Sequence, residues 1–236
     1  MKFAITGHTG GIGSEIIRQL KEKFPDCEIR GYSRATNYDL TNIKDVTRMA
    51  DHANDCDIFI NCVFGGHAQT MVLYKMWEYW QLEKKIICSV DSNAVDRVTN
   101  FAFPYAAWKA AHQRACKQLE HLHRPSQGIH CKVVYPEYGL VDTECSQRMV
   151  PQYETLKTIK VQDCCKTAID FILMNYESEY YFPTIKMLPE EHINDCWVYD
   201  PEMSKYMGAS PAHTKLIGEK ADKIQKKLKK NRIKNQ

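Results

Sequence analysis

Tyr105 and Lys109 are four positions apart in the string Tyr-Ala-Ala-Trp-Lys, a spacing that places a phenol and an ammonium on the same face of a helix. A free phenol titrates near ~10, and a neighbouring ammonium favours its ionised form. Such a pair can pass a proton to or from a reacting oxygen. Because the same spacing is common on ordinary amphipathic helices, the interpretation depends on the elements that surround the pair.

Three glycines, Gly7, Gly11 and Gly13, follow the apolar segment at the start of the chain. A glycine-rich turn between a strand and a helix lets the backbone approach a pyrophosphate, and the helix N-terminus offers free N–H groups and the positive end of its dipole. We expect Gly7 to form the tight turn, Gly11 to leave room for the phosphates and Gly13 to let the helix pack on the strand. A dinucleotide cradle and a proton-transfer pair together indicate a nicotinamide-dependent oxidoreductase.

Strand-like and helix-like segments alternate along the chain. Segments that read as strands lie at residues 2–6, 28–32, 57–62, 85–90 and 130–135, with weaker candidates at 38–40 and 180–185. Helical periodicity predicts helices over residues 12–24, 68–82, 103–122 and 161–175. Strands that are apolar throughout and alternate with helices are typical of a parallel sheet covered on both faces. The predicted fold class is therefore α/β, with the Tyr105/Lys109 pair on the helix that follows the 85–90 strand.

The length of 236 residues suits one sizeable domain. We expect a nucleotide-binding domain over residues 1–200 and a C-terminal extension over residues 201–236. Residues 215–236 hold nine basic and two acidic residues, a charge of +7, so the rest of a chain with net charge +3 carries −4. The simplest interpretation of this basic segment is a terminal helix. Nonspecific contact with nucleic acid is the less favoured alternative, and we expect no nucleic-acid partner.

Cysteine usage and hydropathy indicate a cytoplasmic protein. The ten cysteines include no Cys-x-x-Cys pair, which favours reduced, mostly buried thiols over a disulfide framework, and we expect no metal site. No apolar run approaches the roughly 18 residues that suggest a membrane helix. Lys2 leads directly into the first strand and glycines soon interrupt the apolar stretch, so we expect no signal peptide and no membrane partner.

The glycine turn and the tyrosine–lysine string together resemble the two signature motifs of the short-chain dehydrogenase/reductase family. The first motif is Thr-Gly-x-x-x-Gly-Ile-Gly at residues 6–13 and the second is Tyr-x-x-x-Lys at residues 105–109, and the resemblance covers about residues 1–185. It implies a Rossmann-like, single-domain α/β fold, in which a doubly wound parallel sheet has helices on both faces. It also implies an NAD(P)-dependent oxidoreductase that interconverts a small carbonyl and an alcohol.

This resemblance assigns several further positions to the cofactor. Besides the three glycines they are Thr9, Ile12, Ser33, Arg34, Asp39, Leu40, Asn61, Tyr105 and Lys109. Asn61 matches the first position of the family's Asn-Asn-Ala-Gly motif, and Asp39-Leu40 is similar to the acidic–aliphatic pair beside the adenine. The second strand ends with Arg34 and no acid. A guanidinium can grip a phosphate, whereas an acid there would favour an unphosphorylated ribose. We therefore favour NADP(H), with NAD as the alternative.

The resemblance further implies a catalytic set of Ser92, Tyr105 and Lys109. Tyr105 would exchange the proton, and Lys109 would favour the phenolate and hold the nicotinamide ribose. Ser92 would hydrogen-bond the substrate oxygen. Its distance from Tyr105 along the chain favours Ser92 over Ser89, although a serine at this point could simply cap the end of the strand.

Two departures from the family motifs leave a second function open. Residues 65–84 contain no counterpart of the family's helix asparagine, for which a water or Gln69 is a candidate substitute, and Asn61 continues as Cys-Val-Phe. Both would suit a nucleotide-sensing or interaction protein without turnover; a reductase or epimerase of nucleotide-linked sugars is a further alternative. The intact Tyr105/Lys109 pair favours the enzyme. Because the family often pairs through the helix that matches residues 103–122, a homo-oligomer is also a candidate.

Overall fold

A computed structural model of the chain describes residues 1–96, 103–149 and 157–187. The expected C-terminal extension over residues 201–236, with its basic segment at 215–236, lies outside the described residues. So does the end of the expected nucleotide-binding domain, beyond residue 187.

A five-stranded parallel sheet forms the centre of the fold. In chain order its strands are β1 (Lys2–Thr6), β2 (Glu28–Tyr32), β3 (Ile58–Asn61), β4 (Ile86–Ser89) and β6 (Lys132–Val134). They lie side by side in the order β2-β1-β3-β4-β6, and every pairing is parallel. All residues of β3 and β4 are buried, because these central strands are covered on both faces. The strand order reverses at β1, and in open α/β sheets ligands bind at such a switch point, outside the carboxyl ends of the strands.

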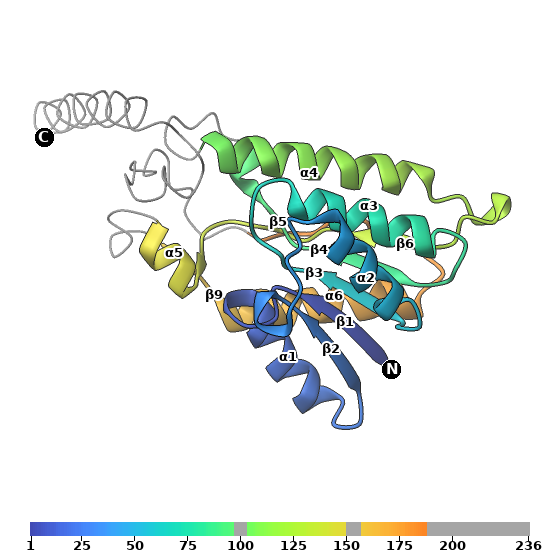
Figure 1. Cartoon of the computed structure of the whole chain (residues 1–236), viewed down its shortest axis with the longest axis horizontal. Coiled ribbons are helices and arrows are strands. Elements are labelled where there is room, and N and C mark those ends of the chain that lie inside the picture. The colour runs from blue at the N-terminus through green and yellow to red at the C-terminus, as the bar shows by residue number, and fades with distance from the viewer. Residues whose placement is uncertain (97–102, 150–156, 188–236) are drawn as a thin grey trace, which may run out of the picture.

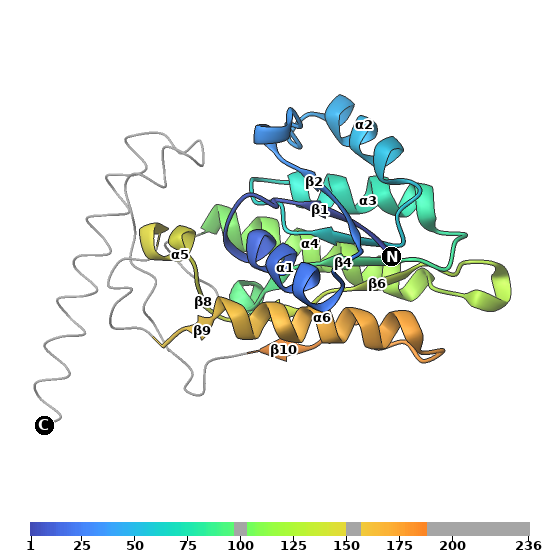
Figure 2. The same ribbon diagram turned by 90° about the horizontal axis from the view of Figure 1, so that it is seen from below.

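Helices pack on both faces of this sheet. One face is covered by α1 (Gly11–Lys23) and α6 (Val161–Glu177), and the other by α2 (Ile43–Ala53), α3 (Ala68–Trp80) and α4 (Phe103–Leu122). Figure 1 shows the order of these elements, and Figure 2 shows α2 and α3 on the opposite side of the sheet from α6. The predicted doubly wound α/β fold is confirmed, and α4 has the predicted bounds.

Short elements complete the described part of the chain. The two-residue strands β5 (Asp91–Ser92), β7 (Glu137–Tyr138) and β10 (Lys186–Met187) form a small parallel sheet, and β8 (Val141–Asp142) pairs with β9 (Ile159–Lys160). Three short 3-10 helices, η1 (Arg34–Thr36), η2 (Asn93–Asp96) and η3 (Pro125–Gln127), and the short α-helix α5 (Glu144–Met149) are the remaining described helices.

Two of the weaker strand predictions are wrong. Residues 38–40 form no strand, because the chain leaves the sheet at η1 and the Tyr38 ring packs edge-on against Tyr32 with ring centroids 5.0 Å apart. The last described strand is β10, at Lys186–Met187, and residues 180–185 form no strand.

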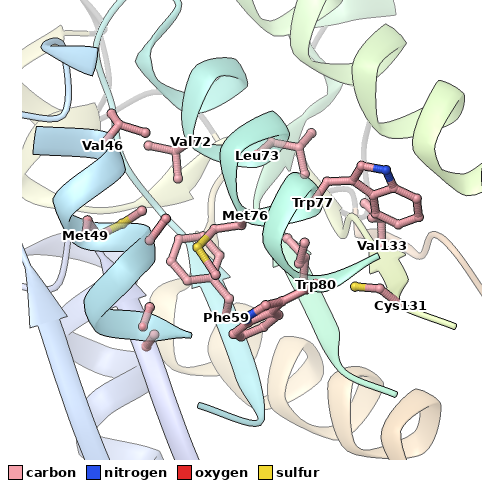
Figure 3. Close-up of a cluster of buried hydrophobic side chains, with 14 of the residues drawn as sticks. Val46, Met49, Phe59, Val72, Leu73, Met76, Trp77, Trp80, Cys131 and Val133 are labelled. Atoms are coloured by element: carbon pink, nitrogen blue, oxygen red, sulfur yellow. The ribbon is translucent and has the colours of Figure 1, made fainter. Parts of the chain in front are cut away.

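The larger hydrophobic core lies between the sheet and the α2–α3 layer. Phe59 of β3 meets Trp80 of α3 edge-on, with ring centroids 6.3 Å apart, and Met76 and Met49 lie in the same cluster (Figure 3). Trp80 and Phe59 are fully buried, and large aromatic side chains contribute much of a core's burial energy. This packing fixes α3 against β3, and therefore fixes the first turn of α3 near the carboxyl edge of the sheet.

Candidate active site

The glycine turn connects β1 to α1 at the carboxyl edge of the sheet. Gly7 has φ +64°, and a Cβ there would lie 2.6 Å from the carbonyl oxygen of Cys62. A Cβ at Gly13 would lie 2.3 Å from the carbonyl oxygen of Gly7. Gly11 is exposed, with φ +52°, and a Cβ there would meet only the Thr143 methyl group, at 3.7 Å. Gly7 and Gly13 are thus required by the packing of the turn itself, whereas Gly11 faces open space.

Helix α1 begins without a side-chain cap. Its N-cap residue, Gly10, is extended and exposed, and no side chain of the described residues caps the first N–H groups of the helix. Thr9 is also exposed, and Ile12 is half-buried against the core. The first turn of a helix leaves N–H groups without intrahelical partners. Here they lie at the switch point of the sheet, where an anionic ligand would satisfy them.

We expect Gly13→Ala to destabilise the protein by about 1–3 kcal/mol, the cost of forcing an extra carbon into a packed site. The added carbon would collide with backbone, which cannot rotate away as a side chain can. Urea unfolding followed by circular dichroism measures the effect. Gly10→Ala is the matched control, because a Cβ there has no atom within 4 Å and the backbone is extended. Equal stability of the two variants would contradict the packing role of Gly13.

Asn61, at the end of β3, is held entirely inside the protein. Its side chain is fully buried, accepts a hydrogen bond from the Thr6 hydroxyl at 3.0 Å and donates to the backbone carbonyl of Gln69 at 2.9 Å. The Thr6 hydroxyl in turn accepts from the N–H groups of Cys62 and Val63. The structure therefore places the Asn61 amide as an anchor between β1, β3 and α3, and its contact with a cofactor stays a prediction.

Tyr105 and Lys109 lie together on α4, and both are half-buried. The Lys109 Nζ is 5.9 Å from the centroid of the Tyr105 ring. It donates to Gln69 Oε1 at 2.8 Å and to the Val90 carbonyl at 2.9 Å. The ring of Phe64 lies 5.7 Å from that of Tyr105, centroid to centroid, and the Phe64 side chain is 53% exposed. The Tyr105 ring and the Lys109 ammonium are therefore neighbours, and the ammonium lies against Val90 just after β4.

The two serine candidates differ in exposure. Ser89 is fully buried inside β4, whereas Ser92 is only half-buried in β5. The Ser92 hydroxyl accepts from the N–H of Ala94 at 3.2 Å, which is the capping contact considered above. That bond leaves the hydroxyl proton free to be donated, since a serine can accept and donate at once. Of the two, Ser92 is the one that a substrate oxygen could reach.

No protein-family model matches the chain, and no curated protein is significantly similar to it. Solved structures do match. A small-chain dehydrogenase in complex with NADPH superposes with a TM-score of 0.61 at 18% identity, over 79% of this chain and 96% of that protein. A short-chain dehydrogenase from Burkholderia cenocepacia in complex with NADP gives 0.60 at 18% identity, over 79% and 87%. An NADH-dependent reductase responsible for alginate metabolism gives 0.62 at 14% identity, over 82% and 97%.

This chain has the fold of the short-chain dehydrogenases and reductases. The match spans most of the described residues and nearly the whole length of the first and third structures. At 14% to 18% identity it establishes the arrangement of strands and helices. Any chemistry must therefore be argued from the side chains that this chain places on the dehydrogenase fold.

In this dehydrogenase fold the end of β2 is the place where the adenosine half of a dinucleotide would lie. Arg34 is exposed in η1, and its guanidinium makes no hydrogen bond within the described residues. Ser33 is half-buried beside it. The Asp39 carboxylate accepts from the N–H and hydroxyl of Thr41, and these bonds lower the pKa of Asp39. Leu40 is buried and packs in the larger hydrophobic core.

Sequence reasoning missed Asp91, which precedes Ser92. Its side chain is 2% exposed, and neither carboxylate oxygen has a hydrogen-bond partner within the described part of the chain. Burial raises the pKa of Asp91 to about 6, while the Lys109 ammonium opposes the shift. On the adjacent strand Glu137 is also buried, but it accepts from Gln113 and pairs with Lys186. An aspartate after an apolar strand gives no sequence signal for burial, because that position usually lies in an exposed loop.

Over residues 1–96, 103–149 and 157–187, no helix is long and apolar enough to cross a bilayer. Across the same ranges, no three histidine, cysteine or acidic side chains gather closely enough to hold a metal ion.

Proposed function

We propose that this protein is an NADP(H)-dependent oxidoreductase that interconverts a small carbonyl compound and its alcohol. One observation carries the proposal: the short segment from Cys62 to Phe64 touches both halves of the site. The Cys62 carbonyl lies against Gly7, and the Phe64 ring lies against Tyr105. Two residue steps span at most about 7 Å. The cradle and the proton-transfer pair are therefore close enough to serve one extended ligand.

The residues present fit a dinucleotide. Helix α1 offers N–H groups without a side-chain cap, and Gly11 leaves the space beside them open. These groups would hold the phosphates, Arg34 and Ser33 would lie beside the adenosine ribose, and Lys109 would hold the nicotinamide ribose. When bound, the nicotinamide supplies or accepts the hydride. No other group in the site needs to carry electrons.

The protein's own residues manage the proton and the developing charge. In the reduction direction the Tyr105 O–H bond breaks as a new O–H bond forms on the substrate oxygen. The Ser92 hydroxyl donates a hydrogen bond to that oxygen and stabilises its negative charge. The phenolate left on Tyr105 lies beside the Lys109 ammonium, which stabilises it. Oxidation of the alcohol follows the same steps in reverse.

The direct test of this proposal is a titration of the full-length protein with NADPH, followed by a substrate panel. Binding is measured by cofactor fluorescence and turnover by loss of the NADPH absorbance with small aldehydes and ketones. Saturable binding and turnover of at least one carbonyl compound are expected. A protein that binds neither NADPH nor NADH would not be an oxidoreductase of this kind.

Arg34→Ala is expected to weaken NADPH binding by about 1–3 kcal/mol, the scale of a hydrogen bond to a charged group, and to leave NADH binding nearly unchanged. The exposed guanidinium can grip the 2′-phosphate that only NADPH carries. Fluorescence titrations with both cofactors measure the difference. Arg18→Ala is the control, because Arg18 is a surface arginine already bonded to Glu15 and Glu22. If the wild-type protein binds NADH as tightly as NADPH, the proposed phosphate recognition is wrong.

A second candidate is a nucleotide-binding protein without turnover. The observation that favours it is the exposed Phe64 ring, which lies against the Tyr105 ring. Such a protein would bind NADPH but reduce no carbonyl compound, and Tyr105→Phe would leave its behaviour unchanged. Association of copies through α4 stays a prediction, which analytical ultracentrifugation can test. The cytoplasmic location also stays a prediction.

A further inference from the structure

We propose that Gln69 is the positioning residue of Lys109: its side-chain amide holds the ammonium against the end of β4 and so sets where the ammonium meets Tyr105 and the cofactor. This role rests on the proposed oxidoreductase function. Gln69 lies in the first turn of α3 and is 6% exposed. Gln69 lies within residues 65–84, which contain no counterpart of the family's helix asparagine.

The Gln69 amide bridges three groups. Its Oε1 accepts from the Lys109 ammonium at 2.8 Å. Its Nε2 donates to the Val90 carbonyl at 2.6 Å and to the Asn61 carbonyl at 3.3 Å. Only one orientation of the amide satisfies these contacts. The flipped amide would set its NH₂ group against an ammonium and its oxygen against two carbonyls, which are pairs of like polarity.

Rigid elements hold Gln69 on both sides. Its backbone carbonyl accepts from the Asn61 amide, which is itself bonded to Thr6. The rest of α3 is fixed by the core around Trp80 and Phe59 (Figure 3). The chain of hydrogen bonds therefore runs from β1 through Asn61 and Gln69 to Lys109. A flexible lysine side chain is ordered in advance, and such preorganisation is what a precisely placed charge requires.

The alternative is that Gln69 merely satisfies buried backbone groups. Both carbonyls that it contacts already have another donor: Val90 O accepts from Lys109, and Asn61 O accepts from the N–H of Val90 at 3.1 Å. Among the described residues, Gln69 is the one that supplies a side-chain acceptor for the ammonium. These residues engage two of the three N–H donors of Lys109, so the third can bond a ribose hydroxyl.

Two substitutions separate positioning from packing. Gln69→Met keeps the length but removes the acceptor, whereas Gln69→Glu keeps an acceptor for Lys109 but sets a carboxylate against the two carbonyls. A positioning role predicts that Gln69→Met weakens NADPH binding at least fivefold and lowers kcat at least tenfold. Gln69→Glu should restore NADPH affinity to within about twofold of wild type, even though it unfolds at a lower temperature than Gln69→Met.

A packing role predicts the opposite order, with Gln69→Glu the worse binder, and that result would overturn the proposal. Gln113→Met is the matched control, since Gln113 is a buried glutamine of α4 that bonds Glu137 and Lys117 but not Lys109. It should lower the unfolding temperature without changing NADPH affinity. If Gln69→Met does not fold, Gln69→Asn replaces it, because the shorter side chain withdraws the acceptor from Nζ. Wild-type affinity in both acceptor-removing variants would overturn the role of Gln69 alone, whereas a wild-type protein that binds no NADPH would overturn the proposed function together with it.

Discussion

Tyr105→Phe is expected to lower kcat by about 10²–10⁴-fold, the usual contribution of a positioned general acid, with NADPH affinity within about twofold of wild type. The variant removes one oxygen from a half-buried ring whose packing against Phe64 does not depend on it. Without the phenol, no proton is delivered to the substrate oxygen as its charge develops. Single-turnover oxidation of bound NADPH, followed by absorbance with an accepted carbonyl substrate, measures the loss at the chemical step.

Lys109→Ala provides the contrast, because it should damage both NADPH binding and turnover if the ammonium holds the ribose and stabilises the phenolate. Tyr74→Phe is the control for loss of a tyrosine hydroxyl, since Tyr74 is an exposed residue of α3 that bonds Gln118. Full activity in Tyr105→Phe would remove the proposed mechanism. It would leave the fold in place and favour the nucleotide-binding protein without turnover.

The positions of the long elements could be predicted from sequence because each has a strong periodic pattern. Helix α4 has the predicted bounds, and β1 and β2 match residues 2–6 and 28–32. The strands of the small β5-β7-β10 sheet could not be predicted, since two-residue strands have no periodicity and pair across distant parts of the chain. The strand predicted at residues 38–40 is wrong, since Leu40 enters the core from a loop, which a short sequence pattern does not distinguish from a strand.

The candidate site shows the same division between local and tertiary information. The glycine turn and the Tyr105/Lys109 pair are local motifs, and the structure brings them to the same edge of the sheet. A motif match assigns Asn61 to the cofactor, whereas its burial depends on Thr6 and Gln69, which meet it only in the folded chain. The burial of Asp91 and the bond between Gln69 and Lys109 are likewise products of tertiary packing. Sequence reasoning could name Gln69 as a candidate but could not assign its partner.

Gly11→Asp is expected to abolish NADPH binding while leaving the protein folded. The cradle position is open, and an added Cβ would be in ordinary contact with the Thr143 side chain, at 3.7 Å. The backbone is left-handed there, with φ +52°, a conformation that costs most L-residues about 1–2 kcal/mol but that aspartate and asparagine tolerate better. A carboxylate about 4 Å from a phosphate charge costs about 4 kcal/mol at an effective dielectric constant of 20. Because each 1.4 kcal/mol is about tenfold in affinity, the dissociation constant should rise by two to three orders of magnitude.

Gly11→Asn separates charge from strain in this experiment. Its side chain has the same shape as aspartate, and Asn37 already adopts φ 61° elsewhere in the chain, so the backbone cost should be similar and modest. We expect Gly11→Asn to bind NADPH within about tenfold of wild type, a loss of about 1.4 kcal/mol or less. The two variants should unfold at similar temperatures, and higher ionic strength should recover part of the affinity of Gly11→Asp, because salt screens exposed charges. If both variants lose binding equally, the loss reflects backbone geometry. If neither does, the phosphates of the cofactor do not lie at the glycine turn.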